Sequence, residues 1–232
     1  MTPADLMRRR REPLRLVIFD CDGVLVDSEP ISNRVVAEAV TSAGWPISAE
    51  EARVRFLGMT LTDMLPTIEA EIGHPLPRGW KDEVHAAIIG ALARDATAIP
   101  GAVQALRATT ALGLPWRIAS NSSREEMGVK FRRLGIADLV AGRLHSHRDV
   151  RRGKPAPDLF VAAARAQGVP PSACVVIEDS LPGVQAAAAA GMDCLGFAAH
   201  TDPRTLEALG AACFSQMSEV PGLLELALQT AE

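Results

Sequence analysis

Short runs of apolar residues, rich in β-branched and aromatic side chains, recur along the chain and alternate with longer segments of helical period. Four of these runs span residues 14–19, 115–119, 174–178 and 193–197. A continuous apolar run bounded by turn residues is typical of a strand that is buried on both faces of a parallel sheet. Strands that alternate with helices at this spacing predict βαβ units, and therefore a doubly wound α/β core with helices on both faces.

The helical segments between these runs have recognisable ends. Each opens at a capping pair or a proline and closes at a glycine, which is the usual asymmetry of helix boundaries. The boundary residues are Ser122 with Glu125 and Gly135, Pro157 with Gly168, and Pro182 with Gly191. These signals predict three helices that each lead from one strand of the sheet to the next.

One long segment, residues 29–97, carries no strand pattern. Its apolar positions recur at steps of three and four between Leu57 and Ile72, which is the period of a helix. Capping pairs that begin at Ser48 and Thr60 are typical of helix starts. We therefore expect a helical insertion that interrupts the α/β core after its first strand.

This insertion divides the chain into a core and a cap. We expect the α/β core in residues 14–28 and 98–232, the helical cap in residues 29–97, and an N-terminal tail in residues 1–13. The tail contains the basic run Arg8 to Arg11, but no apolar stretch with a cleavage site follows it, as an export signal would require.

Composition narrows the classes of function. The net charge of −4 argues against a general nucleic-acid binder, because affinity for the phosphate backbone needs clustered positive charge. A membrane span would need an apolar run of about 18 residues, and the sequence has none. The four cysteines show no CxxC spacing, which favours reduced thiols and a cytoplasmic protein. His145 and His147 could meet a metal ion, but a polar loop is the favoured interpretation.

The residues most suggestive of chemistry are Asp20-Cys21-Asp22, which directly follow the first apolar run. In an extended backbone the two carboxylates point to the same side, while Cys21 points to the opposite side and packs. Buried carboxylates repel each other unless a cation pairs them, and Mg²⁺ prefers such oxygen ligands. One carboxylate can attack phosphorus while its neighbour transfers protons.

Further polar residues follow the other strands, and ligands of open α/β sheets bind at these strand ends. Ser120 and Asn121 follow the second run and are suited to an anion. Lys154 supplies a positive charge for phosphoryl oxygens. Glu178 and Asp179 end the third run and are suited to the metal.

Together these segments resemble the four ordered motifs of the haloacid dehalogenase superfamily of hydrolases. The segments are residues 20–28, Ser120-Asn121, Gly153-Lys154-Pro155 and residues 176–180. The insertion is similar to the helical cap of the subfamily that includes phosphoglycolate phosphatase, sugar phosphatases and β-phosphoglucomutase. The resemblance covers nearly the whole chain beyond its first dozen residues and implies a Rossmann-like core.

The resemblance also implies roles for the reacting groups. Asp20 would be the nucleophile, and Asp22 would be the general acid and base. Ser120 and Lys154 would hold the transferring phosphoryl group, with Asn121 as a further phosphate-binding residue. Phosphoryl transfer depends mainly on positioning and charge stabilisation, so these groups suffice for it.

A metal site is implied at the same place. Mg²⁺ would be bound by the Asp20 carboxylate, the Asp22 backbone carbonyl and Asp179. Glu178 would be either a further ligand or a carboxylate behind the ligands.

The choice of reaction depends on a few positions. Dehalogenases of this fold lack the second aspartate, so Asp22 favours phosphorus chemistry. β-Phosphoglucomutases carry a histidine and an arginine where this chain has Ser32 and Leu61, which favours a phosphatase over a mutase. A non-catalytic regulatory protein is the remaining alternative. In the cap, Gly58 and Thr60 are candidate substrate contacts.

We therefore expect a Mg²⁺-dependent phosphatase that acts on a sugar or sugar-acid phosphate through an aspartyl-phosphate. Its expected partner is that small metabolite, with no nucleic acid and no membrane, and a monomer is favoured.

Overall fold

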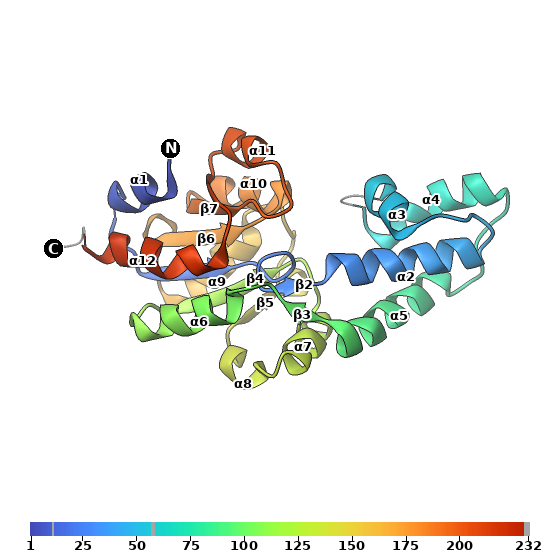
Figure 1. Cartoon of the computed structure of the whole chain (residues 1–232), viewed down its shortest axis with the longest axis horizontal. Coiled ribbons are helices and arrows are strands. Elements are labelled where there is room, and N and C mark those ends of the chain that lie inside the picture. The colour runs from blue at the N-terminus through green and yellow to red at the C-terminus, as the bar shows by residue number, and fades with distance from the viewer. Residues whose placement is uncertain (11, 57–58, 230–232) are drawn as a thin grey trace.

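The computed structural model describes residues 1–10, 12–56 and 59–229. Figure 1 shows a parallel sheet with helices on both faces and a group of four helices that projects from one end of it. The predicted α/β fold class is confirmed. Among the described residues, no helix is both long and apolar enough to cross a membrane.

The six strands of the sheet are parallel and lie in the order β5-β4-β1-β6-β7-β8. Their bounds are β1 Leu16–Phe19, β4 Trp116–Ser120, β5 Leu144–Ser146, β6 Cys174–Glu178, β7 Asp193–Phe197 and β8 Ala212–Phe214. The strand order reverses at β1, which lies between β4 and β6. At such a reversal the carboxyl ends of neighbouring strands open a crevice, so the residues that follow these three strands meet at one edge.

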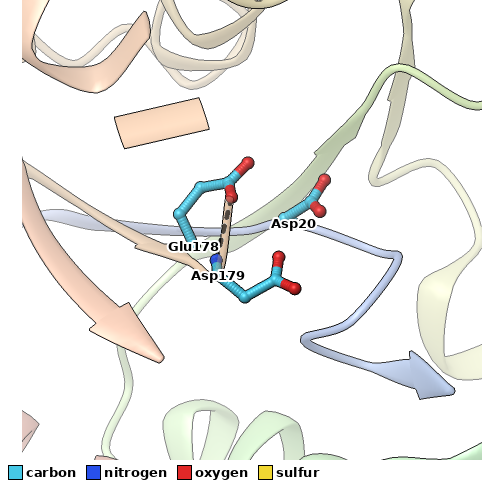
Figure 2. Close-up of side chains that lie close together, drawn as sticks. All are labelled: Asp20, Glu178 and Asp179. Carbon is cyan, nitrogen blue, oxygen red and sulfur yellow. Dashed lines mark hydrogen bonds between the residues drawn. The ribbon is translucent and has the colours of Figure 1, made fainter. Parts of the chain in front are cut away.

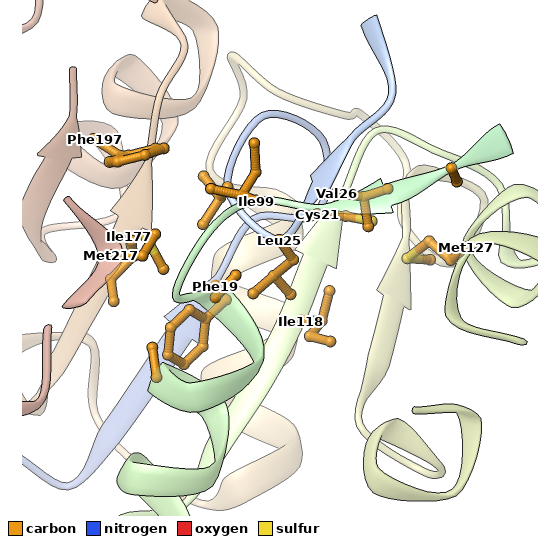
Figure 3. Packing of buried hydrophobic residues seen from close by; sticks show 14 of the residues in the cluster. Phe19, Cys21, Leu25, Val26, Ile99, Ile118, Met127, Ile177, Phe197 and Met217 are labelled. Atoms are coloured by element: carbon orange, nitrogen blue, oxygen red, sulfur yellow. The ribbon is translucent and has the colours of Figure 1, made fainter. Parts of the chain in front are cut away.

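Both faces of the sheet are covered by apolar clusters. Val17 and Phe19 of β1 belong to one cluster, whereas Leu16 and Ile18 belong to the other, because successive side chains of a strand alternate. Cys21 packs in the same cluster as Phe19, on the side predicted for it (Figure 3).

The first cluster includes residues of α1 Pro3–Arg8, α6 Ala102–Ala111, α7 Arg124–Arg133, α8 Ala137–Val140 and α12 Val220–Gln229. The second includes residues of α9 Asp158–Gln167, α10 Leu181–Ala189 and α11 Pro203–Ala208. Short 3₁₀ helices are η1 His147–Asp149, η2 Pro171–Ala173 and η3 Met217–Glu219. The four cysteines are free thiols, as expected.

The projecting helices are α2 Glu29–Ser42, α3 Ala49–Arg55, α4 Leu61–Ile72 and α5 Trp80–Asp95. Helix α2 packs against α3 and α5, and α5 also packs against α7 of the core. The capping boxes predicted at Ser48 and Thr60 are both present. The two connections to the core pair as a short antiparallel ribbon, β2 Val26–Asp27 with β3 Thr97–Ala98.

Two sequence expectations were wrong. The segment expected to be a tail contains α1, which buries Leu6 and Met7 and packs against α12, and Arg10 is ion-paired with Asp193. The capping box of α7 uses Ser123 with Glu126, one residue later than predicted. Both errors have the same cause. Tertiary contacts decide whether a terminal segment packs on the core and which of two adjacent serines caps a helix, and local sequence patterns do not reveal those contacts.

Candidate active site

Three carboxylates from two strand ends share one edge of the sheet. Asp20 directly follows β1, Glu178 is the last residue of β6, and Asp179 comes next. One oxygen from each lies within 4.8 Å of the others, and Figure 2 shows the three side chains gathered where the strands end. Together with Ser120 and Lys154 they line a cavity of about 180 Å³.

Lys154 enters this cavity from the loop before α9. Its Nζ donates hydrogen bonds to Asp20 Oδ1 at 2.6 Å and to Glu178 Oε1 at 2.5 Å, and the residue is 9% exposed. Burial alone would lower the pKa of Lys154, but the two carboxylates outweigh burial and raise it. Lys154 is therefore a fixed cation in contact with Asp20.

Glu178 is fully buried, and both of its carboxylate oxygens are engaged. Oε1 accepts from Lys154, and Oε2 accepts from the backbone N–H groups of Asp179 and Ser180 and from the Ser180 hydroxyl, each at 2.9 Å. A Cβ on Gly183 would lie 1.8 Å from Oε1, so only glycine leaves room here. These contacts give Glu178 the role of orienting Lys154; direct metal ligation by Glu178 stays a prediction.

Asp22 lines the same cavity. Its Oδ1 accepts from Lys130 Nζ at 2.5 Å and from the Ser28 hydroxyl. Its Oδ2 accepts from the hydroxyls of Ser122 at 2.7 Å and Ser120 at 3.2 Å. Burial alone would raise the pKa of Asp22, but Lys130 and the hydroxyls lower it to about 2. Asp22 is therefore a carboxylate, the form that accepts a proton.

Sequence reasoning missed three of these partners. Ser28 occupies the N-cap of α2, but its hydroxyl makes no capping bond and donates to Asp22 instead. Ser122 was assigned to a capping box that Ser123 forms instead, which leaves the Ser122 hydroxyl for Asp22. Lys130 carries no motif signal, because it lies within an ordinary basic helix.

Asn121 has a contact that the sequence did not reveal. Its Nδ2 donates to the Lys154 carbonyl at 3.1 Å, and its Oδ1 accepts from the Lys154 N–H at 2.9 Å. This pair of bonds fixes the loop that carries Lys154. Phosphate binding by Ser120 and Asn121 stays a prediction.

Comparison with known proteins identifies the family. A family profile described as a haloacid dehalogenase-like hydrolase matches residues 14–191. The chain belongs to this family. The hydrolase is also 31% identical over 211 residues to a 6-phosphogluconate phosphatase of Escherichia coli, covering 90% of this chain and 94% of that protein. With such phosphatases as relatives, it is a phosphoric monoester hydrolase.

Solved structures agree with this assignment. A HAD family hydrolase from Deinococcus radiodurans with bound phosphate and sodium shares 34% identity and a TM-score of 0.79, over 93% of this chain and 97% of that one. A putative beta-phosphoglucomutase from Thermotoga maritima has 26% identity and a TM-score of 0.79, over 91% and 99%. The hydrolase therefore has the architecture of this family through both the core and the projecting helices.

The hydrolase has more negative charge at the strand ends than Lys154 neutralises. Burial, assisted by Glu178 and Asp22, raises the pKa of Asp20 to about 7 against the pull of Lys154. Burial and the neighbouring Glu178 and Asp20 raise the pKa of Asp179 to about 9. No described residue donates a hydrogen bond to the Asp179 carboxylate or forms an ion pair with it. A hard divalent cation such as Mg²⁺ fits this oxygen cluster, in which the Asp179 carboxylate has no partner among the described residues.

The turn after Asp22 is shaped around the same carboxylate. Gly23 has φ +77°, and a Cβ there would lie 1.9 Å from Asp179 Oδ2. Any side chain at this position would therefore displace the Asp179 carboxylate. The glycine thus leaves room for this candidate metal ligand.

Residues of the projecting helices line a neighbouring cleft. Thr60 caps α4 and lines a cavity of about 450 Å³ that reaches Asn121, whereas Gly58 lies outside the described residues. Ser32 and Leu61, the two positions at which a mutase is expected to carry histidine and arginine, line this cavity too. Both therefore line the cleft between the projecting helices and the loop that follows β4.

The two histidines considered as metal ligands lie apart from the carboxylates. Within the described parts of the chain, the one cluster able to hold a metal consists of Asp20, Glu178 and Asp179. His145 belongs to β5, where burial lowers its pKa, and His147 begins η1.

Proposed function

We propose that this hydrolase is a Mg²⁺-dependent phosphatase of a sugar phosphate or sugar-acid phosphate, acting through an aspartyl-phosphate on Asp20. The placement of Asp20 carries the proposal. Its carboxylate stands at the end of the central strand, 2.6 Å from Lys154, and a second carboxylate follows two residues later. A nucleophile, a fixed cation and a proton-transfer group thus surround one cavity, as phosphoryl transfer requires.

In the first step, an oxygen of Asp20 forms a bond to phosphorus and the bond from phosphorus to the leaving oxygen breaks. Asp22 gives its proton to the leaving oxygen, so an alcohol departs. Because Asp22 is a carboxylate in the free enzyme, it takes up this proton from solvent as the substrate binds, when the negative charge of the phosphate ester favours the protonated form beside it. Lys154 balances the charge on the phosphoryl oxygens throughout.

After the first step Asp22 is a carboxylate. In the second step, water attacks phosphorus and gives a proton to Asp22. The bond from phosphorus to Asp20 breaks, so inorganic phosphate leaves and the Asp20 carboxylate is restored. Asp20, Asp179 and the Asp22 carbonyl would hold Mg²⁺, which supplies further charge neutralisation at the phosphoryl group.

The cleft beyond the catalytic cavity supports a substrate with a second acidic group. Lys81 from α5 and Arg148 from η1 line it and can pair with such a group, although the carboxylates of Asp82 and Glu126 also line this cleft. We propose that residues 29–97 act as the cap that recognises this end of the substrate. The activity named for the Escherichia coli relative, on a sugar acid phosphate, supports the same class of substrate.

The direct test is phosphate release from a panel of phosphorylated sugars, alditols and sugar acids, with Mg²⁺ and with EDTA. We expect release with Mg²⁺, little release with EDTA, and none from Asp20→Asn. The exposed Asp138→Asn change in α8 is the matched control and should leave the rate unchanged. Full activity of Asp20→Asn, or no release from the whole panel, would refute the proposal.

A mutase is the second candidate, supported by the similarity to the putative β-phosphoglucomutase structure. Conversion of β-glucose 1-phosphate to glucose 6-phosphate with little free phosphate would decide for it. Because Ser32 and Leu61 replace the expected histidine and arginine, we expect free phosphate as the main product.

A further inference from the structure

A second buried lysine lies beside the active site and belongs to none of the motif segments. Lys130, on α7, is 2% exposed. Its Nζ donates to Asp22 Oδ1 at 2.5 Å and to Ser122 Oγ at 2.9 Å. A lysine is rarely buried unless it is paired, and both partners of this one contact the site.

The two oxygens of Asp22 have different surroundings. Oδ1 accepts from the Lys130 ammonium and from the Ser28 hydroxyl, whereas Oδ2 accepts only from the hydroxyls of Ser120 and Ser122 among the described residues. An ammonium can only donate, but a hydroxyl can donate or accept. Oδ2 is therefore the oxygen that can carry a transferable proton, and it faces Ser120 at the phosphoryl site.

Lys130 also lies where the cap rests on the core. With Ile88 and Leu92 of α5 it lines a cavity of about 290 Å³ that extends to Asp22. Helices α5 and α7 pack together, and Arg133 Nε donates to the Arg94 carbonyl at 2.6 Å. The helix that supports the cap therefore also supplies the cation that holds Asp22.

We infer that Lys130 is a positioning residue for proton transfer, which holds Oδ1 of Asp22 so that Oδ2 faces the reacting oxygen. In the first step Oδ2 protonates the leaving oxygen as the bond from phosphorus breaks, and in the second step Oδ2 takes the proton of the attacking water. This inference rests on the proposed phosphatase function. Loss of Lys130 should therefore matter most for substrates whose leaving oxygen needs a proton.

The test compares two substrates by kcat/KM, which reports the step in which the leaving group departs. Lys130→Met should lower kcat/KM about 100-fold for the best metabolite from the panel, within the range of general acid catalysis. For 2,4-dinitrophenyl phosphate, whose leaving group needs no proton, the loss should stay below about tenfold. Lys130→Arg, which keeps a cation, should recover most of the metabolite activity. The exposed Arg132→Met on the same helix is the control and should change neither value.

A double-mutant cycle separates positioning from general structural damage. In an Asp22→Asn background, Lys130→Met should cause no further loss, because Lys130 acts through Asp22. This neutral pair also avoids leaving a buried unpaired carboxylate if the single variant folds poorly. The inference would be overturned by equal losses on both substrates, by additive losses in the cycle, or by an unchanged Lys130→Met enzyme. Each of these outcomes would leave the proposed phosphatase function standing. A wild-type protein that releases no phosphate would instead refute the proposed function on which it rests.

Discussion

The unpaired carboxylate of Asp179 should make the metal-free protein less stable as pH rises. In the folded protein its pKa is about 9, against a usual value of 3.8 that the unfolded chain should show. Between pH 6 and pH 8 the folded state therefore keeps a proton that the unfolded state has lost. A group that binds its proton more tightly in the folded state loses its stabilising contribution as pH rises towards the folded pKa.

The expected size follows from the linkage relation. A difference of nearly one bound proton changes the free energy of unfolding by about 1.4 kcal/mol per pH unit, so the loss between pH 6 and pH 8 is about 3 kcal/mol. Asp20, whose pKa is raised to about 7, adds to the loss in the lower half of this interval. This is a large share of a total stability of about 5 to 15 kcal/mol.

The assay is urea unfolding in EDTA at pH 6, 7 and 8, followed by tryptophan fluorescence. Wild-type stability should fall across this series, and Asp179→Asn should show a much flatter dependence because it has no proton to lose. Saturating Mg²⁺ should stabilise the wild type more at pH 8 than at pH 6, since the metal needs ionised carboxylates. If wild type and Asp179→Asn show the same slope in EDTA, the carboxylate is not desolvated and the reasoning fails.

Two further predictions concern packing and specificity. Gly183→Ala should lower kcat about tenfold or more, because overpacking of this kind displaces Glu178 from Lys154. The control is Gly222→Ala, because a Cβ at Gly222 would meet open space. A Gly183→Ala enzyme with full activity would contradict the proposed role of Glu178. Lys81→Met and Arg148→Met should each raise KM about tenfold for a sugar-acid phosphate, as loss of a charge-assisted hydrogen bond predicts, and leave KM for the matching alditol phosphate unchanged. Equal effects on both substrates would show that the cleft does not recognise an acid.

The carboxylates of the candidate site could be picked out from the sequence because their signal is local. A buried parallel strand is largely apolar, so charged residues at its carboxyl end stand out in the sequence, as Asp20 does after β1 and Glu178 does as the last residue of β6. The carboxyl ends of adjacent strands meet at one edge, so their proximity could be expected without coordinates. Lys154 was recognised by its place between glycine and proline and by its order among the motifs.

Other contacts left no such signal. Lys130 has arginines close by in the sequence and resembles a surface lysine, and only the packing of α7 against the sheet and α5 buries it beside Asp22. Ser122 and Ser123 offered nearly equivalent capping patterns, and the structure assigns one to the helix and the other to Asp22. Short strands such as β5 and β8 were missed because three residues are too few to show a period.

Residue types and their order were enough to predict the class of fold, the order of the strand-end residues and the chemistry open to two carboxylates at one strand end. These follow from hydrophobic period and residue type, which are local properties of the chain. The groups that surround each carboxylate became visible only in the folded protein: Lys154, itself oriented by Glu178, at Asp20, and Lys130 and Ser28 at Asp22. Hydrogen bonds between residues more than a hundred positions apart, such as Lys130 to Asp22, depend on how helices pack on the sheet, and no local pattern encodes that packing.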